Sequence, residues 1–266
     1  MRLPGVASVL TALASSVLLL FLLAPVGAVV ARGGWSGVAS LAADTELRGA
    51  LLLTALCATA ATLIGVVLGT PVAWLLARTP FRGRALVAAA LDLPLVIPHP
   101  VAGIALLLVL GRESVLGQGL GALGIRIVSS PLGIVLAMLF VSATLYVSAA
   151  REAFARVDRR FESVALTLGD TPLRAFRRVT LPLAGRGLLA AAVVMWARAV
   201  SEFGAIVVIA HSPRTIAVLS YDRFTTYGLG DALPVAAVLV LLALIPLAAL
   251  RALRADRGEH APGRRA

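Results

Sequence analysis

A charged interval, 151-REAFARVDRRFESVALTLGDTPLRAFRRVTLPLAGR-186, separates two long apolar runs of this sequence. Within it, Phe161, Val164 and Leu168 recur at helical spacing, and Gly169 follows them. Apolar residues at i, i+3 and i+7 line one face of an α-helix, and glycine commonly ends a helix. The pattern therefore predicts a short amphipathic helix that ends at Gly169.

A second short helix is expected directly after this glycine. Asp170 or Thr171 can cap it, Pro172 suits its first turn, and Pro182 is expected to end it. The two predicted helices are then joined by a tight turn. Basic amphipathic helices lie either on anionic lipid or in a groove of a partner protein, and the pattern alone leaves both readings open.

Apolar runs extend on both sides of the interval and set the fold class. Of 266 residues, 60% are hydrophobic and 14% are charged, whereas about a quarter of an ordinary soluble domain is charged. Crossing a bilayer takes about 20 apolar residues. We therefore predict an all-α, polytopic membrane protein with six transmembrane helices, at residues 5–30, 49–77, 85–111, 128–150, 187–210 and 232–250.

The first run is expected to stay in the mature chain. Its uncharged stretch reaches from Leu3 to Ala31, which exceeds the roughly 7 to 15 apolar residues of a secretory signal. We divide the chain into an N-terminal span with an extracytoplasmic loop (1–48), a core of five spans (49–250) and a basic cytoplasmic tail (251–266).

Arginine is distributed unevenly between the two sides of the predicted bundle. The N-terminus and residues 78–84, 151–186 and 251–266 hold 17 arginines, whereas the alternate segments hold 6. Positive residues concentrate on the cytoplasmic side of membrane proteins. We therefore expect a multi-pass protein of the cytoplasmic membrane, with both termini and the loop 151–186 in the cytoplasm.

All 24 basic residues are arginine, so the chain has no lysine. A P-loop needs a lysine to reach the phosphates of a nucleotide, and Schiff-base catalysis also needs one. The chain therefore has no such ATPase site of its own, and we predict no enzymatic activity, no cofactor and no metal in it. Arginines placed between apolar runs indicate a membrane surface rather than nucleic acid.

Two charged residues fall inside the fifth predicted span. Arg198 lies near its centre, and Glu202 follows one turn later on the same face. Each costs about 2.5 to 3.5 kcal/mol at a helix centre in the bilayer. We therefore expect both side chains to face the bundle interior or a wet cavity, either as an ion pair that fixes the packing or as part of a substrate path.

Three prolines interrupt the third predicted span. Pro94, Pro98 and Pro100 each remove an amide donor or clash with a preceding carbonyl, so we expect the helix to break near the middle of the membrane. Irregular backbone at that depth is tolerated where protein or water covers it. Asp92 and His99 are therefore expected to line an interior surface.

The charged interval also carries the residues of a known motif. ESVALTLG at 162–169 and VTLP at 179–182 are separated by nine residues and resemble the EAA motif of ABC importer permeases. Ser163 stands where that motif usually has its glutamate, with Glu162 just before it. In that family the two helices seat in a cleft of the ATPase subunit. The resemblance implies docking residues Glu162, Ala165, Gly169, Leu173, Phe176, Leu181 and Pro182.

Four further stretches resemble the oxyanion branch of these permeases, which serves sulfate, molybdate and tungstate. They are GTPVAWLLARTPFRG (69–83), PLVIPHPVAGIALL (94–107), ARAVSEFGAIVVIA (197–210) and HSPRTIAVLSYDRFTTYGLGDALPVAA (211–237). The last stretch is similar to the molybdate/tungstate permeases of archaeal type, so we favour molybdate or tungstate, with a sulfate/thiosulfate permease as the alternative.

The resemblance implies a fold and a set of partners. It implies a type I, MetI-like, permease fold and a complex of two copies of this chain, two ATPase subunits that bind ATP, and an extracytoplasmic oxyanion-binding protein. The translocation path or gate would include Asp92, Pro98, His99, Arg198, Ser201, Glu202 and Gly204. Two other classes stay open: a membrane-embedded enzyme, and an ion-coupled transporter with Glu202 as its proton site.

Overall fold

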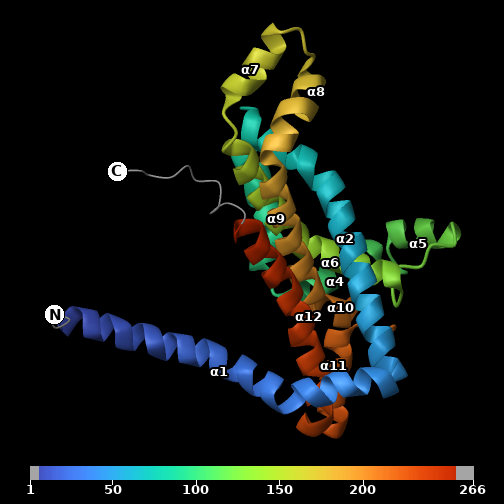
Figure 1. Ribbon diagram of the computed structural model, residues 1–266. Coiled ribbons are helices and arrows are strands. Elements are labelled where there is room, and N and C mark those ends of the chain that lie inside the picture. The colour runs from blue at the N-terminus through green and yellow to red at the C-terminus, as the bar shows by residue number, and fades with distance from the viewer. Residues whose placement is uncertain (1–5, 256–266) are drawn as a thin grey trace.

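The computed structural model describes residues 6–255. The prediction that the N-terminus and tail residues 256–266 are cytoplasmic therefore concerns residues outside the described range. Every regular element in the described range is helical (Figure 1). The elements are α1 (Val6–Ala43), α2 (Thr45–Arg78), α3 (Arg84–Val96), α4 (His99–Leu110), α5 (Val115–Ala122), α6 (Pro131–Ala155), α7 (Arg159–Thr167), α8 (Pro172–Ala175), the π-turn η1 (Phe176–Thr180), α9 (Leu181–Val200), α10 (Gly204–Ile209), α11 (Ile216–Tyr227) and α12 (Leu229–Ala255).

The predicted all-α membrane fold is confirmed. Five helical runs are long and apolar enough to cross a bilayer: Ser8–Ala43, Thr45–Arg78, Pro131–Ala155, Pro172–Val200 and Leu229–Arg251. A sixth crossing is available if α3 and α4 together count as one span. The five runs, together with the bent pair of α3 and α4, correspond to the six spans predicted from the sequence.

The proline-rich third span breaks where the sequence predicts. The axes of α3 and α4 differ by 114° across a break of two residues. Ile97 and Pro98 at the break have extended backbone, and Pro100 occupies the first turn of α4. Proline is tolerated in a first turn because an amide there has no partner inside the helix.

The fifth predicted span is interrupted, which the sequence analysis did not foresee. Its helix ends at Val200, and a separate short helix, α10, begins at Gly204. The carboxylate of Glu202 accepts a hydrogen bond of 2.9 Å from the amide of Ala205 and so satisfies a free donor at the start of α10. A buried carboxylate that caps a new helix stabilises the break.

Pro182 does not end a helix, contrary to expectation. The chain continues from α8 through η1 into α9, and the amide of Leu181 bonds to the carbonyl of Phe176 five residues earlier. A π-turn widens the helix locally, and it places Pro182 in the first turn of α9. Pro172–Val200 is therefore one continuous helical run.

The loop expected after the first span is also helical. α1 continues to Ala43, and Asp44 alone separates it from α2. The side chain of Asp44 accepts a hydrogen bond from the Leu47 amide and caps α2. The first part of α1 runs away from the bundle with its apolar side chains exposed, whereas its end packs on α12 (Figure 1).

The core forms where α2 packs against α6 and α9. Gly65 faces the side chain of Met195, and Gly69 faces the ring of Tyr146, so a side chain at either glycine would collide with a neighbouring helix. The Tyr146 hydroxyl lies 2.7 Å from the hydroxyl of Thr70. The GxxxG spacing thus serves close helix packing.

At the end of the bundle that carries α11, ion pairs join distant parts of the chain. Arg223 of α11 pairs with Asp44 at 2.5 Å and with Glu46 of α2 at 3.2 Å, and Arg214 pairs with Glu46 at 2.6 Å. Burial alone would raise the pKa of Asp44, but hydrogen bonds from Leu47 and Arg223 outweigh it and hold the pKa below its ordinary value. The network fixes α11 on the junction of α1 and α2.

Candidate functional site

The two helix breaks meet inside the bundle. α10 packs against α4, so the residues at the starts of the two helices are neighbours. A Cβ atom at Gly204 would lie 2.6 Å from the Cβ of His99 and 3.1 Å from Pro100. Glycine at position 204 is therefore needed for this close approach, and it brings His99 beside the residues that follow α9.

A charged cluster occupies this junction. Arg198 Nη2 lies 2.8 Å from Glu202 Oε2 and 2.8 Å from His99 Nε2. His99 Nδ1 lies 3.3 Å from the same carboxylate oxygen. Through these contacts α9, the 201–203 link and α4 are joined by one set of polar interactions, which we call the break cluster (His99, Arg198 and Glu202).

Burial differs sharply within the break cluster. The side chain of Glu202 is 1% exposed, that of Arg198 is 22% exposed and that of His99 is 41% exposed. A charge buried this deeply is stable only with partners. Glu202 has Arg198, His99 and the Ala205 amide as partners, so its charge is compensated while the Arg198 and His99 side chains keep an open side.

The other predicted path residues divide into two groups. Pro98 directly precedes α4, and Ser201 lies within 3.5 Å of Arg198, so both adjoin the break cluster. Asp92 does not join it. It is exposed on α3, a helix without a fully buried residue, so its place on an interior surface stays a prediction.

The charged interval forms a helical hairpin that projects from one end of the bundle (Figure 1). α7 ends before Gly169, whose φ of +94° is the left-handed conformation expected for the turn. Thr171 caps α8 through its hydroxyl, with Pro172 in the first turn, as predicted. Asp158 caps α7, a role that the sequence analysis did not assign.

The hairpin leaves much of its apolar surface uncovered. Leu168 is 83% exposed and Leu173 is 68% exposed, and Phe161 and Val164 are exposed as well. A groove of about 670 Å³ lies between α7 and η1. Its lining residues are Phe161, Val164, Ala165, Leu168, Asp170, Arg178 and Val179. Exposed apolar surface around a groove is typical of a protein contact.

The predicted docking residues do not share one face. Gly169, Leu173 and Pro182 are exposed, whereas Ala165 is buried and Leu181 packs on the core. The ring of Phe176 packs against Trp74, with ring centres 5.6 Å apart, and against Phe154. The Glu162 carboxylate points toward α2, where it lies 3.2 Å from Arg78.

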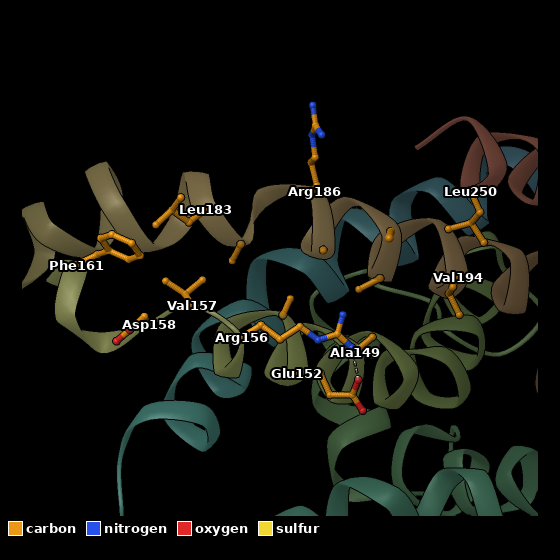
Figure 2. Close-up of a pocket in the computed structure, with 15 residues that line it drawn as sticks. Ala149, Glu152, Arg156, Val157, Asp158, Phe161, Leu183, Arg186, Val194 and Leu250 are labelled. Carbon is orange, nitrogen blue, oxygen red and sulfur yellow. Dashed lines mark hydrogen bonds and ion pairs between the residues drawn. The ribbon is translucent and has the colours of Figure 1, made fainter. Parts of the chain in front are cut away.

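A cavity of about 640 Å³ lies below the hairpin, along the seam between α6 and α9 (Figure 2). Its lining combines small residues of the two helices, such as Ala149, with Phe161 of α7 and Leu250 of α12. Glu152 and Arg156 pair with each other at its side, and Arg186 points away from it in Figure 2. The lining is thus mostly apolar, with a charged pair at its side.

The described residues offer little for metal chemistry. In residues 6–255, no group of three or more His, Cys, Asp or Glu side chains is placed to hold a metal ion. The polar side chains of the break cluster instead link helices to one another.

Sequence reasoning missed the partners of Glu162. Arg78 lies 84 positions earlier in the chain, and Thr180, whose hydroxyl donates to Glu162, lies 18 positions later. The sequence signal was an arginine, Arg78, at the end of an apolar run. It did not indicate which acid pairs with it.

The chain is similar to several known proteins. The family described as binding-protein-dependent transport system inner membrane component matches residues 65–256. A molybdate/tungstate transport system permease protein of Thermococcus kodakarensis is 38% identical over 185 residues, which cover 70% of each chain. A probable molybdenum ABC transporter permease protein of Haloferax volcanii is 40% identical over 237 residues, which cover 87% of this chain and 84% of the relative.

Solved structures agree with the fold. A bacterial ABC transporter involved in the import of the acidic polysaccharide alginate superposes with a TM-score of 0.71 at 15% identity, over 95% of this chain and 96% of that chain. At this identity the likeness concerns the fold.

Proposed function

Because this chain belongs to the family of binding-protein-dependent transport system inner membrane components, we propose that it forms the membrane path of an ATP-driven importer of molybdate or tungstate. It is the permease subunit of an ABC importer, and ATP hydrolysis takes place on a separate subunit. The observation that supports the substrate is the similarity to molybdate and tungstate permeases over more than two thirds of the chain.

We propose that the exposed face of the hairpin docks on the ATPase. Leu168 and Leu173 lie at its tip with most of their surface in solvent. Burying apolar area of this kind yields about 25 cal/mol per Å², which favours a protein groove over water. The working complex would contain two copies of this chain, two ATPase subunits and an extracytoplasmic binding protein, with the hairpin on the cytoplasmic side of the cell membrane.

We propose that the break cluster stands beside the oxyanion path and acts in its gate. The Arg198 side chain keeps an exposed side, and its guanidinium beside a path attracts a divalent anion. Glu202 compensates the charge of Arg198, so an anion in transit would be held weakly and released readily. High affinity for the oxyanion would then belong to the binding protein.

Reconstitution tests the proposed function. The permease, its ATPase and its binding protein are placed in proteoliposomes, and uptake of molybdate, tungstate and sulfate is measured with and without ATP. We expect ATP-dependent uptake of molybdate or tungstate. Uptake that proceeds equally without ATP would favour an ion-coupled transporter, and preferential uptake of sulfate would assign the alternative substrate.

A substitution at the hairpin turn tests docking. Gly169→Val forces a branched side chain into a left-handed backbone conformation and should displace the tip of the hairpin. We expect loss of ATPase stimulation and of uptake, with the helical content of the permease unchanged. Normal uptake by this variant would contradict docking through the hairpin.

A further inference from the structure

The polar contacts between the hairpin and α2 centre on Arg78, which ends that helix. Arg78 Nη2 donates a hydrogen bond of 2.8 Å to the carbonyl of Val157, in the link between α6 and α7. The carbonyl of Arg78 in turn accepts a hydrogen bond of 2.9 Å from the side chain of Arg159 at the start of α7. Two hydrogen bonds therefore attach the end of α2 to the base of the hairpin.

Glu162 completes the attachment. Its carboxylate oxygen Oε1 lies 3.2 Å from Arg78 Nη2 and accepts a hydrogen bond of 2.5 Å from the hydroxyl of Thr180 in η1. One carboxylate thus joins α7, α2 and η1. The exposed residues Phe161 and Leu168 are free for a partner, whereas Glu162 is turned into the permease.

Chain connectivity makes this contact mechanically important. α7 follows α6 through residues 156–158, and α8 continues through η1 into α9. α2 lies far from the hairpin in sequence, so a force on the hairpin reaches α2 through noncovalent contacts. The Glu162–Arg78 ion pair and the ring contact between Trp74 and Phe176 are such contacts.

We infer that Glu162 and Arg78 form a coupling brace that makes α7 and α2 move together when the ATPase displaces the hairpin. This inference rests on the proposed function as an ABC permease. Glu162 is then a positioning residue inside the permease, and the contact with the ATPase is left to the exposed apolar side chains.

Burial gives the brace its strength. The Arg78 side chain is only 7% exposed, and within the described part of the chain its Nε atom has no hydrogen-bond partner. Separating α7 from α2 would leave a nearly buried cation without its carboxylate, which is strongly unfavourable. The two helices should therefore keep their contact through a cycle of movement.

The test uses the reconstituted importer with its ATPase and binding protein. Glu162→Ala removes the carboxylate, and Glu152→Ala is the matched control, because Glu152 is an exposed acid of α6 paired with an exposed arginine. The measured quantity is the amount of oxyanion imported per ATP hydrolysed. For Glu162→Ala we expect this ratio to fall about tenfold while the ATPase still co-purifies. The control should keep the ratio of the unchanged protein.

A double variant separates coupling from stability. Glu162→Ala combined with Arg78→Ala removes both charges, so the thermal stability lost in the single variant should return in part, but the import ratio should stay low. The brace is contradicted if Glu162→Ala keeps a normal ratio, if the double variant recovers the ratio, or if Glu162→Ala loses the ATPase altogether. Absence of ATP-dependent import by the unchanged protein would instead refute the proposed function.

Discussion

Replacing one member of the break cluster should reveal how unequally its charges are buried. Arg198→Met removes the guanidinium that lies 2.8 Å from Glu202, a carboxylate that is 1% exposed. The remaining partners are His99 at 3.3 Å and the Ala205 amide at 2.9 Å. Leaving a buried charge without its main partner costs about 3 to 5 kcal/mol.

The reciprocal substitution should cost less. In Glu202→Gln the amide oxygen can still accept from the Ala205 amide, and Arg198, which is 22% exposed, can be hydrated. A hydrogen bond that involves a charged group is worth about 1.5 to 3 kcal/mol. We therefore expect Arg198→Met to be more destabilising than Glu202→Gln by about 2 kcal/mol, which is roughly 30-fold in the unfolding equilibrium.

The free energy of unfolding can be measured by denaturant titration of the purified permease in detergent micelles, followed by circular dichroism. The double variant Arg198→Met with Glu202→Gln should be more stable than the sum of the two single effects predicts, because neither charge is left alone. The reasoning is refuted if Glu202→Gln is the more damaging single change, or if the two effects simply add.

Three further outcomes are expected. Gly204→Val should bring a side chain into contact with His99 and destabilise the permease by about 1 to 3 kcal/mol, measured as a lower unfolding midpoint. An unchanged midpoint would contradict the close packing of α4 and α10. Leu168→Arg should weaken binding of the ATPase in pull-down while the permease stays folded, and unchanged binding would move the docking face elsewhere. The pKa of Asp44 is lowered in the folded chain, so its pair with Arg223 adds stability at a pH above the ordinary pKa of an aspartate. This stability is lost as pH falls through the pKa of the folded chain. The free energy of unfolding, measured at successively lower pH, should therefore show a loss that Asp44→Asn lacks.

Features set by local chemistry could be predicted from the sequence. Uncharged runs identified the membrane helices, Pro98 and Pro100 located the break between α3 and α4, and Gly169 located the hairpin turn. In each case the residue type itself limits the backbone. The burial of Glu202 also followed from the cost of placing charge in lipid.

Features set by tertiary partners could not be predicted. The break after Val200 has no proline, and the Glu202 carboxylate that caps α10 is buried beside Arg198 and His99, the latter on α4. Pro182 predicted a helix end by its local effect, but the π-turn accommodates it. The inward direction of Glu162 depends on Arg78, which no periodicity connects to it.

The continuity of α8, η1 and α9 has a geometric consequence for the break cluster. Pro172–Val200 contains 29 residues, so at 1.5 Å per residue the run is about 43 Å long. A tilt of about 5° applied at the hairpin would shift the opposite tip by roughly 4 Å on such a rod. Arg198 lies near this far end of the helical run, and its Nη2 atom is 2.8 Å from His99 Nε2 on a different helix. A small rotation at the hairpin is therefore enough to pull these two side chains out of contact.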